Sequence, residues 1–336
     1  MNRDYWPTQD WRQAEAAAVG MRTEALAALA REVEARFESV NALLVGRSGY
    51  LVVENYYNGS GPGAAQVLAS VTKSFTSTLV GIAIDKGYLA GVEQKVMDFF
   101  PEFEASARDD LKRELSLEHL LTMTAGFQWR SGARGYEPML LRLWRSPDWT
   151  AFILGVPVRA RLLGRFQYNS AASHLLSVIL TRATGKCARE FANEHLFGPL
   201  GIGPLPAGDR DREGQAVQWV SDPQGNSTGG WGLNLTAVDM ARFGFLYLNG
   251  GRWEDAQIVS SRWVEASTSP HTPGYGYQWW LRDVHGVRVY AAVGRGGQHI
   301  FCLPDQDVVV VIASRPGGVW RDRWPLLEAF VLPAIG

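Results

Sequence analysis

The sequence predicts an α+β fold, in which helices flank an antiparallel sheet and a mostly helical domain is inserted into the sheet domain. Two observations support this prediction. Strand-like runs lie near both ends of the chain, and helical patterns fill the middle. We therefore expect residues 1–114 and 226–336 to form one discontinuous sheet domain, and residues 115–225 to form the helical domain.

Composition and charge narrow the class of protein. Of the 336 residues, 46% are hydrophobic and 20% are charged, as in ordinary soluble globular proteins. The net charge of −1 gives no bias toward nucleic acid or an anionic membrane as a partner. No apolar run reaches the ~20 residues that span a bilayer, and the first residues do not resemble a secretory signal, so we expect a cytoplasmic protein.

The sequence predicts neither a metal site nor a cofactor. Its six histidines are scattered, with no spacing typical of metal ligands. Cys187 and Cys302 form no CxxC pair and are expected to be buried free thiols.

The first part of the chain predicts a helix, a hairpin and a second helix. Residues 22–37 have helical periodicity, and two β-rich runs within 41–59 flank a turn at "RSG". Residues 70–87 are apolar around most of the helix surface, which indicates a buried helix.

The middle of the chain predicts short helices within 116–126, 170–185 and 188–201, with no strong strand signal. A further helix lies within 235–251, where Thr236 is a candidate cap and Asp239 completes a capping box. The runs at 286–294, 297–304 and 307–314 predict an antiparallel meander, and residues 323–335 predict a final helix.

Ser70-Val71-Thr72-Lys73 opens the buried helix and carries the first chemical signal. A serine there is an ordinary helix cap, but a lysine in the first turn opposes the helix dipole. Burial and the dipole would both lower the pKa of this lysine and leave an amine able to accept a proton. Since residues i and i+3 share one helix face, Lys73 can reach the Ser70 hydroxyl.

Two further segments could complete a site. Tyr168 precedes a helix of small residues, and it could pass a proton to a leaving group or simply be a buried tyrosine. The glycines in "AVGRGGQHIF" mark either a close approach to the backbone or a tight turn into a strand. If an oxyanion forms at Ser70, the backbone N–H of Gln298 is the expected second donor beside that of Ser70.

These pieces together resemble the serine β-lactamase and penicillin-binding-protein superfamily. The order is an SxxK motif (Ser70 to Lys73), then Tyr168-Asn169-Ser170, then Arg295-Gly296-Gly297 in place of a KTG-like triplet on a strand. "LTMTAGFQW", "QYNSA" and "GRGGQHIF" are similar to class C-related esterases and amide hydrolases, especially the 6-aminohexanoate-dimer hydrolase group. The resemblance implies a β-lactamase-like fold with the active site between its two domains.

The resemblance also implies the role of each residue. Ser70 would be the acylated nucleophile, Lys73 its base and Tyr168 the proton relay to the leaving group. The N–H groups of Ser70 and Gln298 would form the oxyanion hole, and the remaining motif residues, Ser170, Arg295, Gly296 and Gly297, would bind substrate.

Two departures from the family pattern bear on the substrate. Ser170 replaces an asparagine that contacts the substrate amide in β-lactamases, and Arg295 replaces a lysine or histidine. A guanidinium can bind a carboxylate but cannot act as a base. Both departures disfavour β-lactam hydrolysis and leave hydrolysis of small esters or amides through an acyl-enzyme as the expected function.

Alternative readings stay open at this point. The chain could be a β-lactamase or D-Ala-D-Ala carboxypeptidase, although no signal sequence is recognised, or a non-catalytic binding module of the same fold. Ser227 lies in a G-x-S-x-G pattern (Gly225 to Gly229), but Pro223 before it and "GGWGLN" after it do not suit the strand–turn–helix of a nucleophile elbow. We expect Ser227 to be a loop residue, in a loop that could border the active site.

Overall fold

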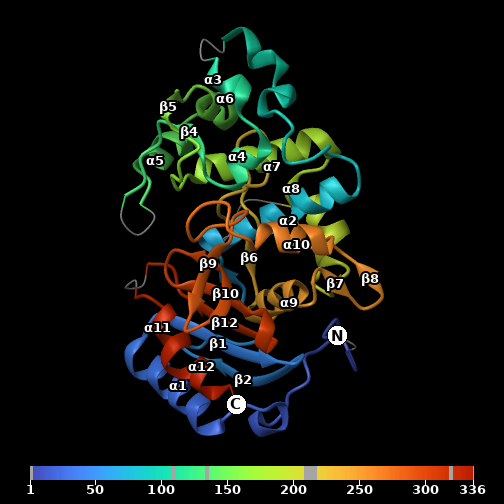
Figure 1. Cartoon of the computed structure of the whole chain (residues 1–336), viewed down its shortest axis with the longest axis vertical. Coiled ribbons are helices and arrows are strands. Elements are labelled where there is room, and N and C mark those ends of the chain that lie inside the picture. Colours follow the sequence, from blue (N-terminus) through green and yellow to red (C-terminus); the bar gives the residue numbers. More distant parts are fainter. Residues whose placement is uncertain (1–2, 107–109, 133–135, 208–217, 318–320, 336) are drawn as a thin grey trace.

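A six-stranded antiparallel sheet is the base of the fold, and the first and last parts of the chain build it together (Figure 1). The computed structural model describes residues 3–106, 110–132, 136–207, 218–317 and 321–335. The strand order is β2-β1-β12-β11-β10-β9. The strands are β1 (Val40–Arg47), β2 (Tyr50–Tyr56), β9 (Trp280–Val284), β10 (Val287–Gly294), β11 (Gln298–Leu303) and β12 (Val308–Ser314).

This sheet confirms the predicted hairpin and the predicted meander. β1 pairs with β2 across the expected turn, and β10, β11 and β12 pair in sequence order. Strand β9, which the sequence did not predict, adds the edge next to β10. The α+β fold class is confirmed, whereas the domain boundaries at 114/115 and 225/226 stay predictions.

Successive residues of the central strands are apolar, so both faces of the sheet carry apolar side chains. Other parts of the chain cover each face. In β12, Val308, Val310 and Ile312 join one buried cluster, and Val309 and Val311 join the other. The first cluster includes α1 (Thr23–Arg36) and the C-terminal α11 (Trp324–Leu326), η8 (Leu327–Val331) and α12 (Leu332–Ala334). The predicted final helix is therefore three short helical pieces, which lie beside α1 in Figure 1.

The other face of the sheet supports the helices that lead to the site. Helix α9 (Ala237–Leu248) packs on this face and begins at the predicted cap, where Thr236 Oγ1 accepts the Asp239 N–H at 3.1 Å. Phe243 of α9 stacks on Phe75 of α2 (Thr72–Asp85), with ring centroids 3.7 Å apart. Helix α2 thus lies between the sheet and the helical part of the chain (Figure 1).

The helical part of the chain contains two short strands that the sequence did not predict. Strands β4 (Ala125–Phe127) and β5 (Val158–Leu163) form a small sheet of their own. The helices around it are α3 (Leu111–Glu114), α4 (Leu117–Leu121), α5 (Pro138–Trp144), α6 (Trp149–Leu154), α7 (Ser170–Thr184), α8 (Ala188–Ala192) and the π-helical η6 (Asn193–Phe197). None of the helices in the described ranges is long and apolar enough to cross a bilayer.

The remaining elements are short. They are η1 (Ala16–Val19), β3 (Gln66–Val67), η2 (Ala69–Val71), η3 (Val96–Phe99), η4 (Pro101–Ser106), β6 (Asn234–Leu235), β7 (Arg252–Trp253), β8 (Ala256–Gln257), α10 (Ser261–Ser267) and η7 (Pro304–Gln306). Helix α10 packs against α2, where Gly81 leaves space for the indole of Trp263.

We expect Gly81→Ala to destabilise the protein by about 1–3 kcal/mol, although alanine is the better helix former. A Cβ at residue 81 would lie 2.4 Å from Trp263 Cγ, so the ring or the helix must move. Urea unfolding measures the effect.

Gly63→Ala is the matched control, because a Cβ there meets nothing within 4 Å. Its free energy of unfolding should change by no more than about 0.5 kcal/mol. Equal effects of the two substitutions would show that the contact with Trp263 does not restrict the size of the side chain at position 81.

Candidate active site

Ser70 lies in a single 3₁₀ turn, η2, that leads directly into α2. It is therefore just outside the α-helix that was predicted to begin at residue 70. Ala69, immediately before it, has a φ of 47°, in the left-handed region that non-glycine residues rarely adopt. Neither η2 nor α2 has a side-chain cap hydrogen bond, so Ser70 does not serve as a helix cap.

Lys73, at the start of α2, has its amine enclosed by three oxygens. Lys73 Nζ lies 3.0 Å from Ser70 Oγ, 2.9 Å from Ser170 Oγ and 2.6 Å from the Gly230 carbonyl oxygen. Its side chain is buried, and this burial lowers the pKa of Lys73 to about 8, although the charge of Glu137 acts in the opposite direction. The amine can therefore accept the Ser70 proton near neutral pH.

Tyr168 lies on the other side of Ser70. Its hydroxyl lies beside the Ser70 side chain, and its ring centroid is 4.8 Å from Lys73 Nζ. Burial raises the pKa of Tyr168 well above its usual value, and the charge of Glu137 raises it further, whereas the Ser70 contact lowers it. Tyr168 is therefore a protonated phenol at neutral pH, whose hydroxyl can pass on its proton while it takes up another. The structure thus brings Ser70, Lys73 and Tyr168 together.

Ser70 and Tyr168 open onto one cavity of about 640 Å³. Most of its other lining residues come from the sheet and the C-terminal segment: Trp280, Leu281, Arg282, Val293, Gly294, Arg295, His299, Asp322 and Trp324. Ser131, Gly132, Pro273 and Gly274 complete the lining. The cavity therefore combines aromatic walls with both signs of charge, as a small-molecule site does.

His299 is a cavity residue that the sequence did not single out. Burial lowers its pKa to about 3, although a hydrogen bond with the Gly297 backbone acts in the opposite direction. Its Nδ1 has no hydrogen-bond partner among the residues that the structure describes. His299 is therefore a neutral imidazole in the wall of the cavity.

The third motif forms a turn rather than part of a strand. Arg295, Gly296 and Gly297 connect β10 to β11, and the two glycines have φ values of 88° and 98°. Arg295 is exposed and lines the cavity, whereas Gly297 packs against the Arg323 guanidinium. Of the four residues predicted to bind substrate (Ser170, Arg295, Gly296 and Gly297), only Arg295 is among the residues that line the cavity.

Gln298, whose backbone N–H was predicted to be the second oxyanion donor, is the first residue of β11. It pairs with Gly294 in the β10–β11 ladder, directly after the turn, and is not among the residues that line the cavity. Its side chain donates to the Ser314 carbonyl at 2.5 Å and accepts the Ser314 N–H at 2.9 Å. The Gln298 side chain therefore links β11 to the end of β12.

Ser170 also differs from its predicted role. It is buried and does not line the cavity, and its hydroxyl bridges Lys73 and Glu137 instead. Glu137 was not found from the sequence, because a glutamate before a proline at a helix start is an ordinary pattern there. Gly230 was missed as well, although the glycine-rich loop next to it was expected to border the site.

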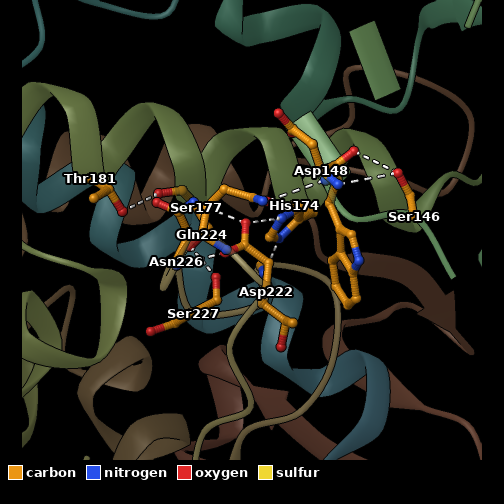
Figure 2. Close-up of polar contacts among 12 residues, drawn as sticks. Ser146, Asp148, His174, Ser177, Thr181, Asp222, Gln224, Asn226 and Ser227 are labelled. Carbon is orange, nitrogen blue, oxygen red and sulfur yellow. Dashed lines mark hydrogen bonds and ion pairs between the residues drawn. The ribbon is translucent and has the colours of Figure 1, made fainter. Parts of the chain in front are cut away.

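A buried histidine–aspartate pair fixes this loop (Figure 2). His174, on α7, accepts the Gly229 N–H at Nδ1 (3.4 Å), so its Nε2 carries the proton and donates to Asp222 Oδ2 at 3.0 Å. Asp222 Oδ2 also accepts the Asn226 side-chain amide at 2.9 Å. The pair therefore holds the chain on both sides of Gly225–Asn226–Ser227.

Ser227 is a structural residue of this loop, as expected. It is fully buried, and its hydroxyl accepts the Arg189 N–H at 3.1 Å. Its carbonyl accepts the Ser177 hydroxyl at 2.6 Å (Figure 2). The two glycines that follow need their small size. A Cβ at Gly229 would lie 2.0 Å from the Ser173 carbonyl oxygen, and one at Gly230 would lie 2.7 Å from that of Ser170.

We expect His174→Ala to destabilise the protein by about 2–5 kcal/mol and to reduce hydrolytic activity. The substitution leaves the Asp222 carboxylate and the Gly229 N–H without their buried partner, and it loosens the loop that holds Lys73. Denaturant unfolding and initial rates of ester hydrolysis measure the two effects. His285→Ala, at an exposed surface pair, is the control and should change stability by at most about 0.5 kcal/mol; a similar loss in both variants would contradict this role for His174.

The chain is similar in sequence and in fold to known proteins. The chain is 28% identical to the 6-aminohexanoate-dimer hydrolase of Paenarthrobacter ureafaciens over 340 residues, which covers 93% of this chain and 82% of that protein. A Bacillus anthracis protein provisionally named as a 6-aminohexanoate-dimer hydrolase has a similar structure, with a TM-score of 0.74, 22% identity and coverage of 97% of this chain and 88% of that one. A family VIII carboxylesterase has a TM-score of 0.70, 17% identity and coverage of 96% and 98%.

These two solved structures show the shared fold, which confirms the β-lactamase-like architecture. The beta-lactamase family profile matches residues 26–326, which is most of the chain. The protein described here belongs to the beta-lactamase family.

Proposed function

We propose that this protein is a serine hydrolase that cleaves small carboxylic esters or amides through an acyl-enzyme on Ser70. The observation that carries the proposal is the contact of 3.0 Å between the Lys73 amine and the Ser70 hydroxyl, with the pKa of Lys73 lowered to about 8. A serine becomes a useful nucleophile when a neighbouring base can take its proton. The family's hydrolase relatives support the same chemistry.

In the proposed reaction, Ser70 Oγ attacks the substrate carbonyl and its proton passes to Lys73 Nζ. The proton then reaches the leaving group by way of the Tyr168 hydroxyl, which already contacts Ser70. The same groups activate water in the second half of the reaction, when the ester on Ser70 is hydrolysed.

The Ser70 N–H and a backbone N–H at the open edge of β10 would bind the oxyanion. Successive residues of an antiparallel strand direct their N–H groups to opposite sides. Gly294 pairs with Gln298, so its N–H is directed toward β11. The next N–H along the chain, that of Arg295, is then directed away from β11. No strand pairs with β10 on that side, because pairing with β9 ends at Ala291. We propose Arg295 as the second donor in place of Gln298, because it lines the cavity and follows Gly294, whose Cβ would lie 3.2 Å from Ser70 N.

The cavity favours ester and amide substrates over β-lactams. Ser170 is directed toward Glu137, so it presents no hydroxyl to a substrate amide. The Arg295 side chain can bind a substrate carboxylate but cannot act as a base.

A fluorophosphonate should label Ser70, and p-nitrophenyl butyrate should be hydrolysed at a rate that Ser70→Ala abolishes. Mass spectrometry of the labelled peptide identifies the site. Label on Ser227, or neither label nor turnover in the folded wild type, would overturn the proposal in favour of another nucleophile or a binding module. Hydrolysis of a chromogenic cephalosporin as fast as that of the ester would instead indicate a β-lactamase or a carboxypeptidase.

We expect kcat/KM for the ester to rise with pH and to reach half of its plateau near pH 8, the pKa of Lys73. The reactive form is the neutral amine. It makes up about one tenth of Lys73 at pH 7 and about nine tenths at roughly pH 9. A profile without an acid limb between pH 6 and 9 would contradict the assignment of Lys73 as the base.

Lys73→Ala should lower kcat/KM by roughly 10²–10⁴-fold while the protein stays folded. Lys86→Ala, at an exposed position after the same helix, is the control and should retain full activity. Retained activity in Lys73→Ala would show that another group deprotonates Ser70.

A further inference from the structure

A buried carboxylate lies behind the Lys73 amine, on the side away from the cavity. Glu137 is 5% exposed, and no cation lies within 4 Å of it in the described ranges of the chain. It stands at the start of α5 but makes no cap hydrogen bond to that helix. Burying a carboxylate without a cation is unfavourable, so its contacts must explain its presence.

The two oxygens of Glu137 have different partners. Oε2 accepts two N–H groups, from Trp129 Nε1 at 2.6 Å and from the Ser170 backbone at 2.8 Å. Oε1 accepts the Ser170 hydroxyl at 2.5 Å, within the usual range for a hydroxyl bound to a carboxylate. An indole or amide N–H does not give up its proton in this pH range, so Oε1 is the oxygen through which Glu137 can gain one.

Ser170 connects this oxygen to the proposed base. Its Oγ accepts from Lys73 Nζ at 2.9 Å while it donates to Glu137 Oε1. A hydroxyl can accept one proton and release another without moving its oxygen. Lys73, Ser170 and Glu137 are 2%, 3% and 5% exposed, so the protein itself forms the path.

We propose that Ser170 and Glu137 form a proton relay for Lys73, an inference that rests on the proposed serine-hydrolase function. As the bond from Ser70 Oγ to the acyl carbon forms, the Ser70 proton moves to Lys73 Nζ. In the same step, a Lys73 proton moves to Ser170 Oγ and the Ser170 proton moves to Glu137 Oε1. The same steps in reverse return the proton to Lys73, from which it reaches the leaving group by way of Tyr168 as the bond to the leaving group breaks.

The relay replaces a buried ammonium and a buried carboxylate with an amine and a carboxylic acid, both neutral. Lys73 thereby regains its lone pair while the tetrahedral intermediate exists. Without the relay, Glu137 would act only as a brace that holds Trp129 and Ser170 through their N–H groups. The two roles predict different results when one contact of the carboxylate is removed at a time.

The test compares Glu137→Gln, Ser170→Ala and Trp129→Phe with the wild type. The first two substitutions interrupt the relay, whereas Trp129→Phe removes the N–H that binds Oε2, together with part of a buried ring, and leaves Ser170 and Oε1 in place. The measurements are kcat and KM for p-nitrophenyl butyrate from pH 5 to 10, initial rates in mixtures of H₂O and D₂O, and the unfolding midpoint of each variant.

The relay predicts that Glu137→Gln and Ser170→Ala each lower kcat roughly 100-fold with little change in KM, while Trp129→Phe stays within about threefold of the wild type. The wild-type rate should fall along a curve with increasing D₂O fraction, because more than one proton moves, and Ser170→Ala should give a straight line. Glu137→Gln should also move the acid limb to lower pH, because the Glu137 charge raises the pKa of Lys73.

Three results would overturn the relay while leaving the proposed function intact. The first is a straight D₂O plot for an active wild type. The second is a kcat within about threefold of the wild type in both Glu137→Gln and Ser170→Ala. The third is a Trp129→Phe variant that loses as much activity and stability as those two variants, which would identify Glu137 as a brace. A wild type that neither hydrolyses the ester nor takes the fluorophosphonate on Ser70 would overturn the proposed function itself. The D₂O plot of the wild type needs no variant to fold.

Discussion

The burial of the Lys73 amine is the constraint on which the rest of the site depends. An ammonium in the first turn of α2 would oppose the helix dipole and lose its hydration, and burial accordingly lowers the pKa of Lys73 to about 8. An amine enclosed in this way must have polar partners. Ser70, Ser170 and Gly230 supply them, and each comes from a different segment of the chain.

Beyond these direct partners, Glu137 and the His174–Asp222 pair form a second layer that does not line the cavity. Glu137 holds Ser170, and the His174–Asp222 pair holds the loop that presents the Gly230 carbonyl. Each of these groups is buried and hydrogen-bonded, which keeps the cost of removing it from water low. The helical part of the chain therefore supplies most of the layer that fixes a lysine carried by α2.

The sheet contributes an open strand edge to the site. Strand β10 extends beyond its last pair with β9, at Ala291, so its final residues have a neighbouring strand on one side only. The turn η2 occupies the other side, where glycine at position 294 lets it approach the strand closely. An unpaired strand edge beside a nucleophile can bind developing negative charge through backbone N–H groups, whatever side chains the strand carries.

The sequence by itself determined the features that depend on near neighbours. Helical and alternating periodicity predicted α1, α2, the β1–β2 hairpin and the meander, and the i, i+3 spacing placed Lys73 beside Ser70. Only the tertiary structure decided that Glu137 and Gly230 join the site, that Ser170 faces away from the substrate, and that Gln298 belongs to the sheet. The outcomes for Glu137, Gly230 and Ser170 rest on contacts between residues 33 to 157 positions apart, such as Ser170 with Glu137 and Lys73 with Gly230. No local pattern encodes such contacts, because they exist only after separate elements have packed and each buried polar group has found its partner.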